Sequence, residues 1–461
     1  MTQDQALDIL KTGVNVFLTG EPGSGKTHTI NSLVGYLRAC DIEPAITAST
    51  GIAATHIGGM TIHSWSGIGI KTKLDKYDLD KIASSEYISK RVRRTKVLII
   101  DEISMLSPNM LDMLDMVCRE IKQNDEPFGG IQIILVGDFF QLPPIVRREE
   151  KDKKQSSLIA QVGSISAFAY GGGAWERAKL VVCYLTEQHR QDDKDFLAVL
   201  SAIRANNVKE THKKHIIERT IEAEDMPENV TKLFSHNFDV DRVNDGELAK
   251  IEEETKLFRM SGSGNDKVIE TLKKGCLSPE ELELKVGAVV MCTKNNPKER
   301  YVNGTLGVVS SFEEFSGYPI IKTKSGRSIE ISPLDWSVEE NGKIRGQITQ
   351  VPLRLAWAIT VHKSQGMSMD AVVMDLSQVF EYGQGYVALS RVRRLSGLYL
   401  LGINEHALKV HPEILEKDMD FKKKSTEAEK VFSKLNKKDL KKMHENFIIA
   451  SGGKVKKTKK I

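Results

Sequence analysis

Four short apolar runs stand out in the first third of the chain. Residues 14–19, 44–50, 96–102 and 132–138 are rich in β-branched and aliphatic side chains, and glycine, hydroxyl or acidic residues end or follow each run. Uninterrupted apolar runs of this length are typical of strands that are buried on both faces of a parallel sheet. Open sheets of this kind bind their ligands at the carboxyl ends of the strands. The pattern therefore predicts an α/β domain whose polar residues gather along one edge of its sheet.

The pattern changes twice further along the chain. Residues 147–174 contain a charged run and a glycine-rich stretch, which predict a connecting loop, and a second α/β region is expected from near Leu180. Within that region, short strands alternate with glycines and predict a small inserted β-barrel. The expected domains are an α/β domain at 1–178 with a small insertion at about 66–94, a second α/β domain at 179–245 and 351–420, a β-barrel at 246–350, and a tail at 421–461.

The composition excludes several classes of protein. No apolar run approaches the roughly 20 residues that a membrane-spanning helix needs, and the run at 14–18 lacks the flanking residues of a signal peptide. The five cysteines are isolated in the sequence, so it indicates neither a zinc site nor a disulfide framework. Because no targeting segment is visible, we expect a protein of the reducing cytoplasm.

Lysine is concentrated at the carboxyl end of the chain. The net charge of the whole chain is +4, whereas residues 421–461 contain 14 lysines and 4 acidic residues, a net of +10, which leaves the remainder at −6. The tail is a candidate contact for nucleic-acid phosphates, or alternatively a solvated, solubilising extension. Because the rest of the chain is net negative, any other surface that binds a polyanion has to be a local cluster of basic side chains.

The loop after the first apolar run fits a phosphate-binding motif completely. Gly20 to Thr27 read GEPGSGKT, between a predicted strand and a predicted helix. Glycines allow backbone N–H groups to close around phosphate oxygens, and the N-terminus of the following helix adds a favourable dipole. In this motif Lys26 would neutralise phosphate charge, and the hydroxyl of Thr27 would bind Mg²⁺.

Two acids end the third apolar run. Asp101 and Glu102 directly follow the residues VLII. In a P-loop hydrolase the first acid binds Mg²⁺, directly or through water, and the second orients or deprotonates the attacking water. The two motifs together predict an enzyme that hydrolyses a nucleoside triphosphate with Mg²⁺ as cofactor.

Further segments narrow this class. The segments are STGIAATHIGGMTIHSWSG (49–67), IDEISML (100–106), VGDFFQLPPI (136–145), TEQHRQDDKDFLAVLSAIR (186–204), LRLAWAITVHKSQGMSMDAVVM (353–374) and YVALSRVRR (386–394). They resemble, in the family's order, the motifs of the Pif-type (petite-integration-frequency) DNA helicases of superfamily 1, in the RecD-like branch. The resemblance covers about residues 1–405 and is specific because independent blocks agree. It implies two tandem RecA-like P-loop domains, a small 1B insertion, and an SH3-like β-barrel (2B) inserted in the second domain.

The resemblance also implies how ATP is held. Gln3 best matches the glutamine that reads adenine in this family, and Gln5 is the alternative. Gln141 would sense the γ-phosphate and couple it to DNA, and Arg190 and Arg391 would reach the γ-phosphate from the second domain as arginine fingers. The implied ATP contacts are Gln3, Gly20, Glu21, Pro22, Gly23, Ser24, Gly25, Lys26, Thr27, His28 and Gly366.

Ten positions match the family's DNA contacts. They are Thr50, Gly51, Thr61, His63 and Trp65 in the first domain and Asn237, Thr360, His362, Lys363 and Ser364 in the second. Trp65 could stack on a base or pack in the core, and both histidines could be structural. The basic run at 90–94, in the expected 1B element, could guide DNA or form a solvated helix end.

The resemblance implies an ATP-dependent helicase that moves 5′ to 3′ on single-stranded DNA, in replication, recombination, repair or telomere maintenance. The direction of movement rests on analogy alone. The alternative is a DNA-stimulated translocase that remodels protein–DNA complexes without unwinding. Expected partners are single-stranded and partial-duplex DNA, G-quadruplexes or RNA–DNA hybrids. We expect a monomer in solution that can dimerise on DNA, in a bacterial-type nucleoid or of viral origin.

Overall fold

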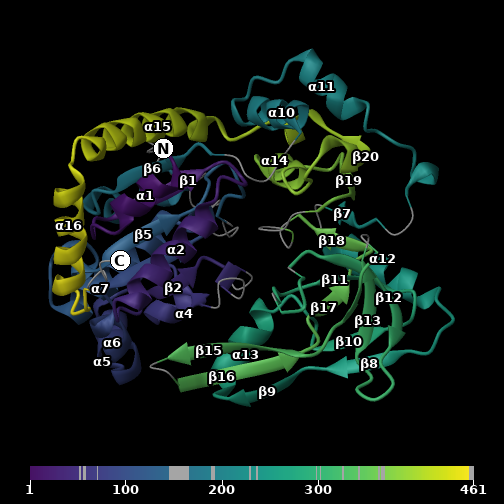
Figure 1. Cartoon of the computed structure of the whole chain (residues 1–461), viewed down its shortest axis with the longest axis horizontal. Helices are drawn as coiled ribbons and strands as arrows, with labels where there is room; N and C mark the ends of the chain where they lie inside the picture. Colours follow the sequence, from purple (N-terminus) through teal and green to yellow (C-terminus); the bar gives the residue numbers. More distant parts are fainter. Residues whose placement is uncertain are drawn as a thin grey trace, which may run out of the picture. The chain divides into compact units, whose positions relative to one another are not determined.

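The computed structural model forms two compact units (Figure 1). The first unit contains Met1–Thr50, Gly59–Arg190 and Pro412–Ile461, and the second contains Gly51–Gly58 and Gln191–His411. The structure describes the chain apart from residues 51–52, 55–58, 70, 145–165, 188–192, 228–229, 235–236, 297, 302, 324–325, 341–342, 362–363, 365–368 and 456–461, and apart from the side chains of 237–239, 339–340 and 343.

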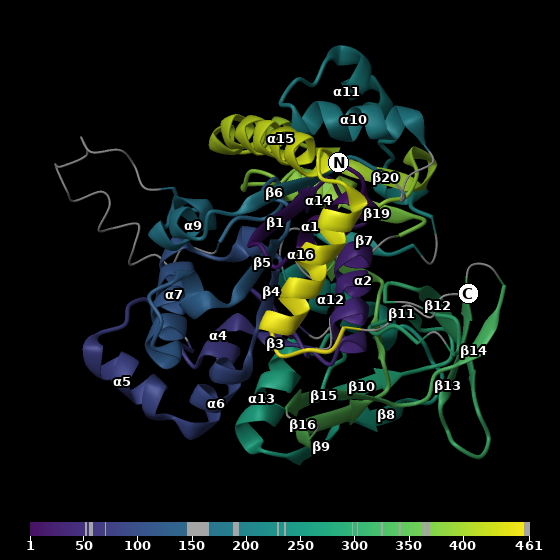
Figure 2. The ribbon, with the colours of Figure 1, turned by 60° about the vertical axis from the view of Figure 1, so that its left-hand side comes forward.

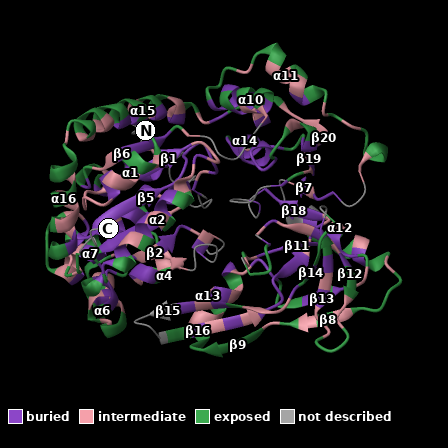
Figure 3. Cartoon of the chain, in the orientation of Figure 1, coloured by how far each residue is buried: buried purple, intermediate pink, exposed green. Residues whose placement is uncertain are grey.

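Six parallel strands form the sheet of the first unit. Their order across the sheet is β3 (Met60–Thr61), β2 (Ala45–Ala48), β4 (Val97–Asp101), β5 (Gln132–Val136), β1 (Val16–Gly20) and β6 (Val181–Leu185). Every residue of β1 and β5 is buried, as Figure 3 shows, because helices cover both faces. The apolar runs of the sequence are thus the central strands, as predicted.

The helices of the first unit surround this sheet. They are α1 (Gln3–Leu10), α2 (Lys26–Ala39), α4 (Ile62–Ser66), α5 (Lys76–Ser84), α6 (Glu86–Arg94), η1 (Ile103–Met105), α7 (Pro108–Lys122), η2 (Pro127–Gly130), η3 (Ala169–Gly171), α9 (Gly173–Arg177), α15 (Pro412–Ser433) and α16 (Lys437–Ala450). Local signals set their ends: the Ser107 side chain accepts the Met110 N–H, and Pro108 occupies the first turn of α7. None of the described helices combines the length and apolar character needed to cross a bilayer.

The carboxyl end of the chain is part of the first unit. The side chain of Phe421 in α15 is 3% exposed, and its ring lies 4.9 Å from that of Phe17 in β1. In α16, Ile448 is 1% exposed and His444 bonds the Asp8 carbonyl at 2.8 Å, so α16 lies beside α1 (Figure 2). The described part of the predicted tail, 421–461, thus belongs to the first unit, because two helices bury their apolar sides there.

The second unit contains a four-stranded parallel sheet. Its strand order is β18 (Ala358–Thr360), β7 (Lys232–Phe234), β19 (Val372–Leu376) and β20 (Leu398–Ile403). The Asn244 side chain bonds both the N–H and the C=O of Ala358 at 2.9 Å, which ties a helix to the edge strand. The helices are α10 (Lys194–Arg204), α11 (Glu210–Ile217), η4 (Ala223–Asp225), α12 (Asn237–Ala249), α14 (Gln384–Leu389), η5 (Leu395–Gly397) and η6 (Glu405–Leu408).

An antiparallel region is inserted into the second unit, as the alternation of strands and glycines predicts. A five-stranded sheet has the order β14 (Ser328–Glu330), β13 (Pro319–Thr323), β12 (Leu306–Phe312), β11 (Val289–Cys292) and β17 (Leu353–Leu355). Two smaller sheets pair β10 (Glu281–Leu284) with β8 (Lys256–Arg259), and β16 (Lys343–Gln350) with both β15 (Leu334–Glu340) and β9 (Ser261–Gly264); α13 (Asp266–Gly275) packs on the second. The region has its own core, which includes Val290, Ile321 and Leu353.

Two predictions about the connection between the units are wrong. The boundary at 178–179 cuts off β6, which pairs in parallel with β1 from Val16↔Val181 to Gly20↔Leu185. An apolar run such as VVCYL is compatible with a buried strand in either parallel sheet, so the sequence pattern does not show which strand it pairs with. The connecting loop predicted at 147–174 lies partly outside the described residues, but Ala169–Gly171 form η3 and Gly173–Arg177 form α9, because the aromatic side chains of this segment join the core.

Candidate nucleotide-binding site

The strand order brings three motifs of the first unit to one edge. The adjacent strands β4, β5 and β1 are parallel, so their carboxyl ends lie side by side. These ends carry Asp101 and Glu102, the turn that contains Gln141, and the glycine loop that begins at Gly20. The expected gathering of polar residues along one edge of the sheet is therefore present.

The glycine loop between β1 and α2 has a conformation that side chains would obstruct. Gly25 has φ +88°, and a Cβ atom there would lie 2.2 Å from Nε2 of Gln3. The Lys26 ammonium donates to the carbonyls of Gly20 at 2.8 Å and Glu21 at 3.1 Å, so it lies over the loop. The Ser24 hydroxyl is buried and has no hydrogen-bond partner among the described residues. A buried hydroxyl of this kind is expected to bind a ligand oxygen, such as that of a phosphate.

The two candidate glutamines in α1 have different contacts. Oε1 of Gln3 lies 2.9 Å from Nδ1 of His28, and its Nε2 donates to the Ser24 carbonyl at 3.4 Å. Gln5 instead completes a capping box with Thr2, whose N–H donates to Oε1 of Gln5 at 2.8 Å. Gln3 therefore contacts the phosphate-binding loop, whereas Gln5 is engaged in starting the helix.

The acidic pair lies at the end of β4. Burial raises the pKa of Asp101, while the Glu102 N–H, bonded to its Oδ1 at 2.9 Å, and the nearby charge of Lys26 lower it. Glu102 has φ +53°, in the left-handed region, so the chain turns sharply after β4. The Ser49 hydroxyl donates to the Glu102 carbonyl at 2.7 Å and holds this turn from the end of β2.

Gln141 belongs to a tight turn after β5. Its N–H donates to the Asp138 carbonyl at 3.0 Å, and the buried Asp138 carboxylate accepts the Phe140 N–H at 3.2 Å. Gln141 itself is 8% exposed. The turn therefore fixes the backbone of Gln141.

The candidate DNA contacts of the first unit differ in exposure. Thr61 caps α4 by accepting the Ser64 N–H at 3.2 Å, and Thr50 is half-buried at the end of β2. Trp65 is 2% exposed, so the structure agrees with the core alternative for this residue. Burial lowers the pKa of His63, which favours its neutral form. Gly51 lies outside the described residues.

The basic run in α6 serves two purposes. Arg91 is 5% exposed, and its guanidinium donates to the carbonyls of Ser64, at 3.0 Å, and of Trp65. Lys90 and Arg94 are exposed. Arg91 thus holds the segment that carries the buried tryptophan, and the other basic side chains remain accessible.

Several candidates of the second unit are buried. Arg391 is 1% exposed; its Nε donates to the Val387 carbonyl at 2.9 Å and its Nη1 to the Ser364 carbonyl at 3.3 Å. Thr360 is 2% exposed and Ser364 is fully buried, with its hydroxyl bonded to the Val361 carbonyl at 2.7 Å. Outside the described residues lie Arg190, His362, Lys363 and Gly366, together with the side chain of Asn237.

Sequence reasoning missed two contributors to the site. Glu187 accepts the Gln3 N–H at 2.7 Å, and Ser49 holds the turn of the acidic pair. Both residues lie inside segments that resemble family motifs, which was the only available signal. Neither contact is local in the sequence, because Glu187 lies 184 positions after Gln3 and Glu102 lies 53 positions after Ser49.

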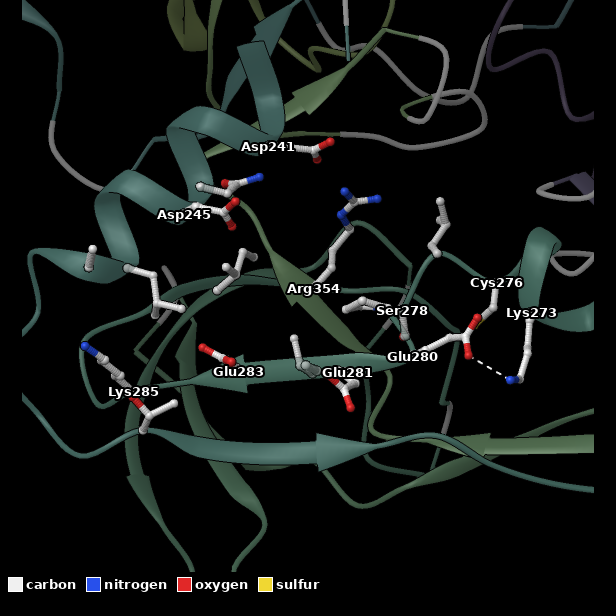
Figure 4. A pocket seen from close by; sticks show the side chains of 18 of the residues that line it. Asp241, Asp245, Lys273, Cys276, Ser278, Glu280, Glu281, Glu283, Lys285 and Arg354 are labelled. Atoms are coloured by element: carbon white, nitrogen blue, oxygen red, sulfur yellow. Dashed lines mark hydrogen bonds and ion pairs between the residues drawn. The ribbon is translucent and has the colours of Figure 1, made fainter. Parts of the chain in front are cut away.

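A separate cavity of about 810 Å³ lies within the second unit, between α12 and the strands β10 and β17 (Figure 4). Arg354 points into it, is 9% exposed, and its buried Nε has no hydrogen-bond partner among the described residues. Burial lowers the pKa of Arg354, and the charge of Asp241 raises it. An ion pair of 2.7 Å between Lys273 and Glu280 closes one side.

The glycine loop, the acidic strand end and the parallel sheets define the class of protein: a P-loop nucleotide-binding protein. A family model described as PIF1-like helicase matches residues 3–214, and one described as DNA helicase Pif1, 2B domain, matches residues 267–312. The ATP-dependent DNA helicase Pif1 of Psychrobacter sp. (strain PRwf-1) is 42% identical, over 99% of this chain and 76% of that protein. This chain belongs to the family of PIF1-like helicases.

Solved structures agree with this assignment. The crystal structure of Bacteroides sp Pif1 in complex with ADP-AlF4 has a TM-score of 0.79 at 30% identity, and covers 91% of this chain and 96% of that one. Bacteroides Pif1 bound to ssDNA has a TM-score of 0.63 at 31% identity, with the same coverage. The two parallel sheets are thus the RecA-like domains of this fold, and the antiparallel insertion contains the 2B domain, which confirms the predicted family and fold class.

Proposed function

We propose that this protein is an ATP-dependent DNA helicase that moves 5′ to 3′ on single-stranded DNA and separates duplex or structured DNA. The observation that carries this proposal is the meeting of Lys26, Asp101 and Gln141 at one edge of the first sheet. Phosphoryl transfer requires a cation on the phosphates, an acid for the attacking water, and a group that senses the γ-phosphate. The name of its Psychrobacter relative, a DNA helicase, supports DNA as the polymer.

Each residue of the site has a task in this proposal. Gln3 and His28 would bind the adenine side of ATP, the loop 20–27 would surround its phosphates, and Lys26 would exchange its two carbonyl partners for phosphate oxygens. Glu102 would take a proton from the attacking water. Gln141 would then distinguish ATP from ADP by its contact with the γ-phosphate.

Magnesium fits the same edge of the sheet. Thr27 presents an exposed hydroxyl in the first turn of α2, and the Asp101 carboxylate lies close enough to Lys26 to interact with its charge. A hydroxyl and a carboxylate are the kinds of oxygen ligand that Mg²⁺ takes beside a nucleotide. A bound Mg²⁺ would neutralise negative charge on the β- and γ-phosphates.

The second RecA-like domain would complete the reaction. Arg190 and Arg391 are proposed arginine fingers, and Arg391 has to leave part of its buried hydrogen-bond network to act directly. Single-stranded DNA would contact the segments around Thr61 and Thr360. The movement would follow from nucleotide-dependent changes between the two domains. We place the enzyme with DNA in the cytoplasm or nucleoid, as a monomer in solution that can dimerise on DNA.

Strand separation on tailed duplexes tests this proposal. One partial duplex carries a 5′ single-stranded tail and the other a 3′ tail, and ATPase rates are measured with and without DNA. Unwinding of the 5′-tailed substrate alone is the expected result. An ATPase rate that DNA stimulates, without unwinding of either substrate, would make the protein a translocase. An ATPase rate that DNA does not change would overturn the nucleic-acid role.

A further inference from the structure

The ring of Phe421, in the carboxyl-terminal helix α15, packs against strand β1 of the sheet that carries the nucleotide site. The Phe421 ring centroid lies 4.9 Å from that of Phe17 and 6.0 Å from that of Phe139, and the Phe139 ring is nearly parallel at 22°. Trp175 and Tyr170 close the cluster, and Tyr170 bonds a carboxylate oxygen of Glu413 at 2.9 Å. Phe421 thus joins an aromatic cluster around Phe139, and its ring comes from a distant part of the chain.

This cluster connects directly to Gln141. Phe139 is 4% exposed and lies two residues before Gln141 in the turn that the Asp138 carbonyl and carboxylate close. Two hydrogen bonds close this turn, so Phe139 and Gln141 belong to one tight backbone segment. Phe17 lies in β1, three residues before the glycine loop, and the pairing of β1 with β5 and β6 holds this strand on both sides.

The helix α15 also braces the edge strand β6. The Ser425 hydroxyl accepts the Tyr184 N–H at 2.9 Å and satisfies a backbone group that the edge of the sheet would otherwise leave open. The next residue, Leu185, packs against Gly20, where a Cβ atom would meet its carbonyl oxygen at 2.7 Å. Glu187 then holds the Gln3 N–H. The end of β6 therefore contacts both the start of the glycine loop and the glutamine beside it.

We propose that Phe421 is a positioning residue for ATP hydrolysis: it sets the place of Phe139 and, through the turn 138–141, the place of the Gln141 side chain. The inference rests on the proposed function, because it requires that Gln141 senses the γ-phosphate. Because Gln141 is proposed to act at the γ-phosphate, the Phe421 ring should affect the rate of hydrolysis more than the binding of the nucleotide. A misplacement of about 1 Å can slow a reaction by up to about 100-fold.

A second ring of the carboxyl-terminal helices supplies a matched control. Phe447 in α16 packs so closely on Gly13 that a Cβ atom there would lie 2.1 Å from its Cδ2. Gly13 precedes β1, at the end of the strand away from the glycine loop. Removing the Phe447 ring should weaken the docking of α16, the helix next to α15, but leave Phe139 in contact with Phe421. Comparing variants of Phe421 and Phe447 therefore distinguishes the positioning of Phe139 from the attachment of the carboxyl-terminal helices.

The experiment measures kcat and KM for ATP with saturating single-stranded DNA, together with the melting temperature, in the full chain. The variants are Phe421→Leu, Phe421→Ala, Phe447→Ala, Gln141→Ala, and the double variant of Phe421→Leu with Gln141→Ala. Leucine keeps most of the buried apolar volume, so Phe421→Leu remains informative if Phe421→Ala fails to fold. We expect Phe421→Leu to lower kcat about tenfold with little change in KM, Phe447→Ala to leave kcat near the parent value, and the loss from Phe421→Leu to shrink in the Gln141→Ala background.

Four results would overturn the inference. Equal losses of kcat in Phe421→Leu and Phe447→Ala, in step with their melting temperatures, would mean that Phe421 only attaches the helix. Additive losses in the double variant would mean that Phe421 acts independently of Gln141. A normal kcat in Phe421→Leu beside an impaired Gln141→Ala would overturn the positioning role alone, whereas a normal kcat in Gln141→Ala would overturn the proposed role of Gln141 as well.

Discussion

The two RecA-like domains expose parts of their motifs to different degrees. In the first, Thr27 and His28 are exposed and Lys26 lies over the glycine loop. In the second, Arg391, Thr360 and Ser364 are nearly inaccessible, and the first and third of them bond carbonyl oxygens of their own domain. A motif residue can therefore either present its side chain to a ligand or use that side chain to hold the backbone of the ligand-binding segment.

Lys26→Ala gives the sharpest contrast, because the Lys26 ammonium lies over the glycine loop and bonds two of its carbonyls rather than holding the core together. We expect ATP turnover to fall by about 1000-fold or more, with the melting temperature and the affinity for single-stranded DNA unchanged. Steady-state ATPase, thermal unfolding and fluorescence anisotropy measure the three quantities. Normal turnover in this variant would remove the phosphate-binding assignment.

Arg391→Ala is expected to affect both turnover and folding. Loss of an arginine finger slows hydrolysis by about 1000-fold, and the carbonyls of Val387 and Ser364 lose a buried donor, which costs about 1–3 kcal/mol of unfolding free energy. Urea denaturation beside single-turnover hydrolysis measures both. A loss of stability without any loss of turnover would make Arg391 purely structural.

Four exposed lysines at the start of α16 offer a test of the basic carboxyl end. Changing Lys437, Lys438, Lys441 and Lys442 to Gln should reduce the salt dependence of DNA binding, by roughly 0.7 in the log–log slope for each single-strand phosphate that the variant no longer neutralises. Truncation at residue 421 is a poorer test, because it also removes the buried Phe421. An unchanged slope would leave these lysines as a solvated surface.

Trp65→Leu, which removes the aromatic ring, separates stacking from core packing in the first domain. Because Trp65 is buried, we expect the affinity for single-stranded DNA to stay unchanged and the melting temperature to fall, since the core loses the indole ring. Base stacking on an aromatic ring is worth about 1–3 kcal/mol, so a comparable loss of binding energy would contradict the buried position. Anisotropy titration with an oligonucleotide distinguishes the two.

The smallest effect is expected at Arg354. Its guanidinium is buried, its Nε has no hydrogen-bond partner among the described residues, and the effect of burial on its pKa outweighs that of the Asp241 charge. Because burying an incompletely paired charge costs free energy, Arg354→Met should change the unfolding free energy by no more than about 1 kcal/mol, in the stabilising direction. A marked destabilisation in urea denaturation would show that the charge has a partner that supports the fold.

The burial of Arg91 shows where reasoning from sequence ends. A run of five residues with four basic side chains predicts either a DNA contact or a solvated helix end, yet Arg91 is enclosed and bonds two carbonyls of the segment around Trp65. The partner lies about 26 residues away in the chain. No pattern within α6 distinguishes this arginine from its exposed neighbours.

The sequence by itself determined the glycine loop, the acidic strand end, the parallel strands around them and the antiparallel insertion, because glycine spacing, apolar runs and alternation are local properties. The tertiary structure decided that β6 belongs to the first sheet, that Gln3 rather than Gln5 contacts the loop, and that α15 places Phe421 against Phe139. These outcomes depend on which distant surfaces fit together, and an apolar run or an amphipathic helix specifies that it must be buried without specifying its partner.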